Sequence, residues 1–163
     1  MSDNAFVTCL WFDDDAEDAA RFYVSLFPDS KLGRITPYPA DAPGGKQAGQ
    51  TMTVEFEING QKFMGLNGGT EFKFSEAISI QILCRDQAEI DRYWDALTSN
   101  GGEESVCGWC KDRWGLSWQV VPEQMPRLLA PDNPARAKAV MDAFMGMRKF
   151  DIATIEAAAH EAA

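Results

Sequence analysis

The chain has 163 residues, 45% of them hydrophobic, which is enough to bury a sizeable core without disulfides. Its formal net charge of −10 at pH 7 argues against a nucleic-acid backbone or an anionic membrane surface as a partner, because both would repel the protein. The sequence shows no apolar run long enough to span a membrane and no signal-peptide pattern at its start, so we expect a cytoplasmic protein whose four cysteines stay reduced.

The N-terminal part of the chain predicts one strand, one helix and three further strands. An acidic run, DDDAED, follows an opening strand over 6–12, and Asp15 within it can cap the helix that follows. Three more strands are expected over 31–38, 51–58 and 61–66. The proline- and glycine-rich stretch 39–50 is predicted to be a loop, and the whole segment forms one βαβββ unit.

A second unit repeats the first at an offset of 71 residues. Residues 8–26 align with residues 79–97, which places Thr8 on Ser79 and superposes the two capping aspartates, Asp15 and Asp86. The alternative is that any two strand-helix segments share such a period. We expect both units to have the same topology.

Residues 109–122, WCKDRWGLSWQVVP, predict a hairpin that reverses through Lys111 to Gly115. Alternation along the returning strand assigns Leu116, Trp118 and Val120 to the core face, and Ser117, Gln119 and Val121 to a half-polar face. The half-polar face is predicted to line a small-molecule cleft. The alternative is an open antiparallel sheet that faces water.

The segment after Pro122 has a different pattern. Asn133-Pro134 is a helix start, and the apolar stripe that follows comprises Ala137, Val140, Met141, Phe144 and Met147. A short strand is expected over 149–152. We expect residues 123–163 to form a helical appendage that packs on the second unit or on a partner chain.

Four motifs together resemble one family. They are LWFDDDAEDAARFYVSLFPDS, LNGGTEFKFSEAISIQI, CGWCKDRWGLSWQVVP and MDAFMGMRKFDI. The chain is similar to the PhnB-like group of the glyoxalase/bleomycin-resistance (vicinal oxygen chelate) superfamily, a group also labelled 3-demethylubiquinone-9 3-methyltransferase. The resemblance implies an α+β fold in which two βαβββ modules, about 6–66 and 77–122, form curved mixed sheets within one glyoxalase-like domain over 1–122.

We expect a homodimer with a small-molecule ligand in the sheet cleft, an expectation that rests on the repeat together with the missing metal ligands described below. The superfamily hosts dioxygenases, isomerases, lyases, thiol transferases and binding proteins on one scaffold, so the fold does not choose among these activities.

Metal-dependent members of the superfamily present His or Glu ligands from the first and last strands of the modules. The matching positions here are Thr8, Ser79, Gln119 and either Met64 or Leu66. Hydroxyl and amide oxygens are weak ligands for a divalent transition metal when no imidazole or carboxylate anchors it, and the one histidine lies in the C-terminal tail. We therefore predict a binding protein without metal or other cofactor, with a metal-dependent lyase, dioxygenase or isomerase as the alternative.

The predicted ligand-binding side chains are polar or aromatic residues expected to point into the cleft. They are Thr8, Thr53, Glu55, Ser79, Gln81, Trp109, Trp114, Ser117 and Gln119. Glu55 is the candidate general base, and the sequence leaves open whether any reaction is catalysed.

Two other chemistries are less favoured. Cys107 and Cys110 have the spacing of a thiol-redox motif or of half a zinc site, but no helix follows them and a strand puts residues three apart on opposite faces. A methyltransferase with a nucleotide-type cofactor would need a glycine-rich turn between a parallel strand and a helix. The glycine pairs lack that context; they are Gly44-Gly45, Gly68-Gly69 and Gly101-Gly102.

Overall fold

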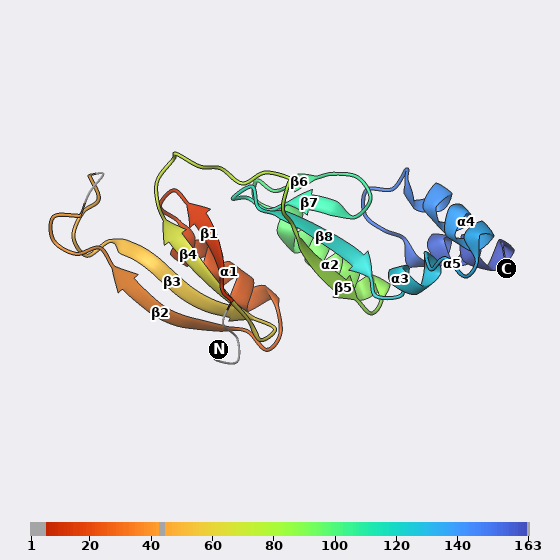
Figure 1. The fold of residues 1–163 in the computed structure, drawn as a ribbon, viewed down its shortest axis with the longest axis horizontal. Helices are drawn as coiled ribbons and strands as arrows, with labels where there is room; N and C mark the ends of the chain where they lie inside the picture. The colour runs from red at the N-terminus through yellow and green to blue at the C-terminus, as the bar shows by residue number, and fades with distance from the viewer. Residues whose placement is uncertain (1–5, 43–44, 163) are drawn as a thin grey trace. The chain divides into compact units, whose positions relative to one another are not determined.

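The computed structural model describes residues 6–42 and 45–162, and the chain divides into two compact units, unit 1 (residues 1–73) and unit 2 (residues 74–163). Each unit contains one four-stranded sheet with a helix against it (Figure 1). The predicted α+β architecture with two βαβββ modules and C-terminal helices is confirmed.

Unit 1 contains one helix and four strands. In chain order they are β1 (Thr8–Phe12), α1 (Ala16–Leu26), β2 (Lys31–Pro37), β3 (Thr51–Ile58) and β4 (Gln61–Asn67). The spatial order of the strands is β1-β4-β3-β2, with β1 parallel to β4 and the other neighbours antiparallel. The Asn59-Gly60 turn between β3 and β4 has positive φ at both residues, which matches the hairpin that the sequence predicts.

The core of unit 1 lies between α1 and one face of the sheet. The apolar stripe of α1 buries Ala19, Ala20 and Tyr23, and the Tyr23 ring lies 6.0 Å from that of Phe56. Phe56 in turn stacks on Phe63, with ring centroids 5.4 Å apart. Alternation therefore leaves the odd-numbered residues of β3 on the other side, the open face of the sheet.

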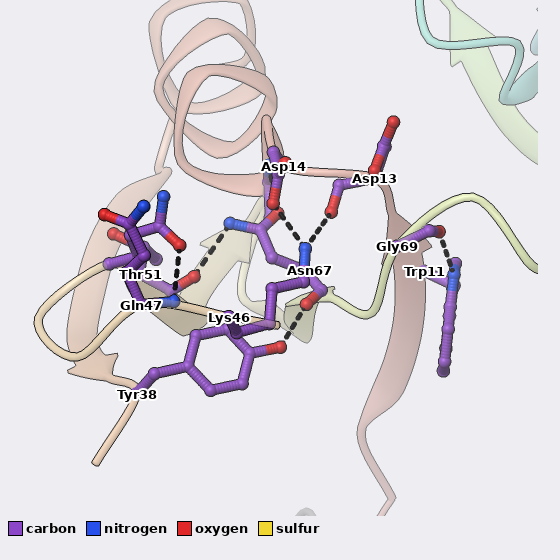
Figure 2. A network of polar contacts seen from close by, with 11 residues as sticks. Trp11, Asp13, Asp14, Tyr38, Lys46, Gln47, Thr51, Asn67 and Gly69 are labelled. Carbon is purple, nitrogen blue, oxygen red and sulfur yellow. Dashed lines mark hydrogen bonds and ion pairs between the residues drawn. The ribbon is translucent and has the colours of Figure 1, made fainter. Parts of the chain in front are cut away.

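The N-terminus of α1 is capped by a residue distant in sequence. Asp15 occupies the N-cap position, but its side chain makes no capping hydrogen bond, and Asn67 Oδ1 accepts from the Ala16 backbone N–H at 2.8 Å instead. Asn67 is buried and donates its Nδ2 to the Thr51 carbonyl at 2.9 Å (Figure 2). The expected capping by Asp15 is thus wrong, because the buried amide at the end of β4 already satisfies the first N–H of the helix.

The 38–50 segment is tied to the same corner of unit 1. Tyr38 donates its hydroxyl hydrogen to the carbonyl of Asn67, and Lys46 Nζ lies 2.5 Å from Asp14 Oδ1 and 3.3 Å from the Asp13 carbonyl (Figure 2). Lys46 of this predicted loop therefore contacts the residues just before α1; Gly44 lies outside the described residues.

Unit 2 repeats this plan and then adds three helices. Its elements are β5 (Ile80–Cys84), α2 (Gln87–Thr98), β6 (Glu103–Glu104), β7 (Trp109–Lys111), β8 (Ser117–Pro122), α3 (Met125–Leu128), α4 (Pro134–Phe144) and α5 (Ile152–Glu161). The strand order is β5-β8-β7-β6, and β5 runs parallel to β8 as β1 does to β4. The shared topology confirms the internal repeat.

The core of unit 2 lies between α2 and the sheet. Trp94 and Leu97 of α2 are buried, as are Trp118 and Val120 of β8, which confirms the predicted core face of the hairpin. The turn of this hairpin is organised by Asp112, a buried carboxylate that accepts from Trp118 Nε1 at 2.8 Å and from two backbone N–H groups at 3.0 and 3.1 Å. A buried carboxylate with three donors is a strong local constraint.

The C-terminal helices attach to unit 2 through its β6-β7 turn and α2. Asn133 caps α4 as predicted, but residues 149–152 form no strand; Asp151 instead caps α5 by accepting from the Thr154 N–H at 2.7 Å. Gln87 of α2 accepts from the Ile152 N–H at 2.9 Å, and Lys149 pairs with Asp91 at 2.9 Å. Across the described chain, every helix is too short or too polar to cross a bilayer.

Candidate functional site

The open face of the unit 2 sheet carries most of the predicted ligand-binding residues. Since Trp118 and Val120 point to α2, alternation places Ser117 and Gln119 on the opposite face. The register sets Gln119 between Gln81 of β5 and Trp109 of β7, so these three side chains share that face. Trp109, Gln81, Ser117 and Gln119 are therefore neighbours, as alternation predicts.

Gln119 is the centre of a short chain of polar side chains. Gln81 Nε2 donates to Gln119 Oε1 at 3.3 Å, and Gln119 Nε2 donates to Ser79 Oγ at 2.8 Å. The amide is half-buried and Gln81 is exposed. This chain offers a ligand uncharged donors and acceptors along one side of the sheet.

Beside this chain lies a cavity of about 500 Å³, here called the Ser117 cavity. It is lined by Glu76, Glu103, Glu104, Ser105, Val106, Cys107, Trp109, Cys110, Lys111 and Ser117. Ser117 is only 1% exposed, and its Oγ has no hydrogen-bond partner among the described residues. A buried hydroxyl without a partner costs free energy that a bound molecule with a complementary group can recover.

One wall of the Ser117 cavity is a tight turn held by the C-terminal segment. Cys107 and Gly108 both have positive φ, 55° and 76°, and their N–H groups each donate at 2.8 Å to the carbonyls of Met147 and Arg148 respectively. A Cβ at Gly108 would lie 2.5 Å from a ring carbon of Phe150, so only glycine allows this close approach. The appendage thus shapes the cavity wall without lining the cavity.

The charges of the cavity are arranged around Lys111. Its Nζ lies 2.5 Å from Glu76 Oε1, and this contact raises the pKa of Lys111 and lowers the pKa of Glu76. Glu104 accepts from Trp94 Nε1 at 3.1 Å and from Arg148 at 3.2 Å, and the Trp94 hydrogen bond is the largest cause that lowers its pKa. These contacts therefore favour the ionised forms of Glu76 and Glu104.

Trp114 lies apart from the cavity-lining residues. It sits in the hairpin turn, where the Arg113 guanidinium lies 4.2 Å from the centre of its ring. The cavity instead contains residues that the sequence analysis did not select, namely Lys111, Glu76, Glu103 and Cys107. Extending the alternation of the hairpin back to Lys111, which is opposite Ser117 in the register, would have found the first of them.

The two cysteines of the predicted redox or zinc spacing have different surroundings. Cys110 is buried in β7, and burial raises the pKa of its thiol to about 12. Cys107 lies in the turn before that strand, with its Sγ 3.8 Å from the Met145 carbonyl. A thiol that stays protonated at neutral pH is a poor nucleophile and a poor metal ligand.

The two glycine pairs that the structure describes in full, Gly68-Gly69 and Gly101-Gly102, do not form a nucleotide cradle. Gly69 follows β4 and accepts from Trp11 Nε1 at 2.7 Å (Figure 2), and Gly101 and Gly102 follow the C-terminus of α2. Neither described pair lies between a parallel strand and the N-terminus of a helix, where a diphosphate would bind.

In unit 1, Thr53 and Glu55 lie on the open face of the sheet. A cavity of about 400 Å³ on this unit is lined in part by Glu55, Glu57, Lys31 and Met64. Glu55 Oε1 lies 2.6 Å from an Arg34 guanidinium nitrogen, and the Glu55 side chain is 47% exposed. An exposed carboxylate that is already paired with a cation is poorly suited to act as a general base.

Thr8 lies on the opposite face of the unit 1 sheet, so its predicted orientation is wrong. The register pairs Thr8 with Phe63 and Leu10 with Gly65, and Phe63 and Leu10 are buried in the core beneath α1. The open face of β1 carries Cys9 and Trp11 instead. Sequence reasoning missed these two because it aligned Thr8 with Ser79.

The length of the strand-helix linker explains this error. Residues 13–15 join β1 to α1, whereas residues 85–86 join β5 to α2. The helices therefore follow the 71-residue offset, but the strands are shifted by one further residue, so Thr8 corresponds to Ile80 and Cys9 to Gln81. The sequence could have revealed this shift, because the linker is DDD in the first unit and RD in the second, one residue shorter.

The register also relates the last strands of the two units. By the observed register, Met64 corresponds to Gln119, since each lies across from the equivalent residue of its first strand. Among the described residues, no three His, Cys, Asp or Glu side chains cluster as a metal site would require.

Comparison with known proteins gives one family and several solved structures. The family model described as 3-demethylubiquinone-9 3-methyltransferase matches residues 4–121. No curated protein matches the chain. The PhnB protein from Bacillus cereus is 31% identical over 72% of this chain and 98% of its own length, with a TM-score of 0.65.

Two more distant structures were also found. A protein from Pseudomonas aeruginosa is 21% identical over 72% of this chain and 96% of that one, with a TM-score of 0.59, which is a likeness of fold. The fosfomycin resistance protein FosX from Listeria monocytogenes is 15% identical over 72% of this chain and 91% of that one, with a TM-score of 0.48. The family match ends before the C-terminal helices.

Proposed function

The chain belongs to the family described as 3-demethylubiquinone-9 3-methyltransferase, as its motifs predicted, and from this premise we propose that it binds a small organic molecule on unit 2. The ligand occupies the Ser117 cavity and reaches the Gln119 chain beside it. The observation that carries this proposal is the buried Ser117 hydroxyl, which lines a cavity and has no partner among the described residues. The volume of about 500 Å³ falls within the range of small-molecule sites.

The neighbouring side chains support the same conclusion. Trp109 provides a flat apolar wall, and Gln119 and Ser79 provide uncharged hydrogen-bonding groups at its edge. Aromatic surface combined with polar groups in fixed positions is typical of sites that bind organic ligands. We also propose that the protein is a homodimer, which light scattering on the purified chain would test.

Tryptophan fluorescence tests the location of the ligand. A panel of small aromatic compounds and thiol conjugates is titrated into the protein and into three variants, Trp109→Phe, Trp11→Phe and Ser117→Ala. We expect a ligand-dependent change that is lost in Trp109→Phe and kept in Trp11→Phe, because only Trp109 lines the Ser117 cavity. A response that disappears with Trp11 instead would place the ligand on the open face of unit 1 and overturn the proposal.

Thiol protection gives a second, independent readout. Cys107 lines the Ser117 cavity and Cys9 is exposed on unit 1, so in a Cys9→Ser background a bound ligand should slow alkylation of Cys107. Undiminished alkylation at a saturating ligand concentration would contradict the proposed location.

Elemental analysis tests the proposal that the protein binds its ligand without a metal ion. Elemental analysis of protein purified without chelator or affinity metal should find no stoichiometric transition metal. About one equivalent per chain would favour a metal-dependent enzyme of the same superfamily instead.

A further inference from the structure

The charged groups of the Ser117 cavity are mostly carboxylates. Glu76, Glu103 and Glu104 line it, and Lys111 is the cation among the lining residues. Arg148 reaches Glu104 from outside the cavity, with a side chain that is 68% exposed. One carboxylate is therefore left in excess even when Arg148 is included.

The excess charge is located at Glu103. Lys111 is paired with Glu76 at 2.5 Å, and Glu104 is held by Trp94 and Arg148. Glu103 lies directly opposite Lys111 in the register of β6 and β7, so its side chain shares the open face, and no hydrogen bond or ion pair to its carboxylate is found within the described chain. Its charge also acts on Lys111, but the Lys111 Nζ is paired with Glu76, so a cation entering the cavity would meet the Glu103 carboxylate without breaking a hydrogen bond or an ion pair.

The remaining walls suit the body of an organic cation. Trp109 offers an aromatic face, whose negative quadrupole attracts ammonium groups, and Val106 adds apolar surface. The unpartnered Ser117 Oγ can accept a hydrogen bond from an N–H donor. The formal charge of −10 on the whole chain favours the approach of a cation and opposes that of an anion.

We propose that the Ser117 cavity is selective for small organic ammonium compounds with an apolar or aromatic body. The ammonium group lies near the Glu103 carboxylate, the body packs on Trp109, and an N–H group donates to Ser117 Oγ. This assignment rests on the proposed binding function and adds the chemical class of the ligand.

Three probes of nearly equal size test this selectivity: benzylamine, benzyl alcohol and benzoate. At neutral pH they carry a positive, a zero and a negative charge. We expect benzylamine to bind at least about tenfold more tightly than the other two, by calorimetry at low salt, and to lose part of that advantage as the ionic strength rises. Equal or tighter binding of benzyl alcohol or benzoate would overturn the proposal.

The variant Glu103→Gln removes the negative charge of Glu103 while keeping a side chain of nearly the same size, and so tests whether that charge causes the preference for benzylamine. Glu156→Gln on α5 is the matched control. We expect Glu103→Gln to reduce the preference for benzylamine to within about threefold of benzyl alcohol, and Glu156→Gln to leave it unchanged. Melting temperatures of both variants establish that they are folded. An unchanged preference in folded Glu103→Gln would place the selectivity elsewhere and contradict the assignment.

The test also separates this proposal from the proposed function. If no probe binds, or if the probes bind without charge preference, the cation assignment fails, and protection of Cys107 by a member of the fluorescence panel then decides whether the cavity binds ligands at all. Failure of that protection as well would remove the binding function itself.

Discussion

At the scale of single residues, Asn67 caps the N-terminus of α1, a role that the local sequence assigns to Asp15. Asn67 Oδ1 accepts from the Ala16 N–H and its Nδ2 donates to the Thr51 carbonyl, whereas the Asp15 side chain makes no capping bond. We therefore predict that Asn67→Ala lowers the free energy of unfolding by about 2 kcal/mol, because it removes one buried acceptor and one buried donor. Asp15→Ala should cost about 0.5 kcal/mol through the helix dipole alone. Urea denaturation of both variants decides the order, and a larger loss for Asp15→Ala would contradict it.

Ser117 is expected to affect stability and binding in opposite directions. Its buried hydroxyl has no partner among the described residues, so Ser117→Ala should raise the free energy of unfolding by about 1 kcal/mol. The same change should weaken any ligand of the cavity, because the hydroxyl is lost from its wall. Denaturation and calorimetry on one preparation test both signs, and a destabilised variant would mean that the hydroxyl has a partner, such as ordered water.

At the scale of elements, the appendage is attached at a point that only glycine can occupy. Gly108→Ala would place a Cβ 2.5 Å from the Phe150 ring and 2.8 Å from the Val120 carbonyl, at a φ of +76°. We predict a loss of more than about 2 kcal/mol and exposure of α4 and α5 to proteolysis. Gly115→Ala is the matched control, since its φ is +85° but nothing lies within 4 Å of its Cβ, and it should cost about 1 kcal/mol. Equal losses would mean that Phe150 moves aside freely.

The attachment of the appendage to α2 is also expected to depend on pH. The pKa of Asp91 is held below its usual 3.8, first by its hydrogen bond to Lys149 and then by its hydrogen bond to Gln87. The Asp91–Lys149 pair therefore stabilises the fold above pH 3.8, and this contribution is lost as the pH falls through the lowered pKa. Lys149→Met should therefore be less stable than the parent near neutral pH, by less than about 1 kcal/mol because the pair is exposed, and the two should converge in acid. Lys138→Met, whose partner Asp142 lies within the same helix, is the matched control for the loss of an exposed lysine that does not link the appendage to α2. A difference that persists in acid would assign the effect to packing of the lysine stem.

At the scale of the whole molecule, the net charge limits the partners. With a formal charge of −10, the chain should show no measurable binding to duplex DNA or to anionic vesicles at about 0.1 M salt. Fluorescence anisotropy and vesicle sedimentation test this expectation. Saturable binding that weakens with salt would reveal a basic surface that the sequence does not suggest.

The fold was largely predictable because its signals are local. The 51–58 strand, the 109–122 hairpin and the repeat follow from alternation, turn residues and self-similarity, and the structure has them at nearly the same bounds. The site was less predictable because its properties depend on distant segments. The burial of Ser117 and the pairing of Lys111 with Glu76 depend on residues that are far apart in sequence, and no local pattern indicates them.

The extra residue in the linker before α1 has a consequence for redesign. A strand side chain turns by half a revolution for each residue, and a helical side chain by about 100°. The lengths of the linkers 13–15 and 85–86 therefore set the register between strand and helix. The helix packs on the sheet in the same way in both units, but the linker length determines which residues of the first strand lie on the open face. Deleting one of the three linker aspartates would force unit 1 either to rotate α1 off its buried stripe or to slide β1 by one position. The second outcome would exchange Cys9 and Trp11 for Thr8 and Leu10 on the open face, so an insertion or deletion outside the sheet changes the chemistry of a surface whose sequence is untouched.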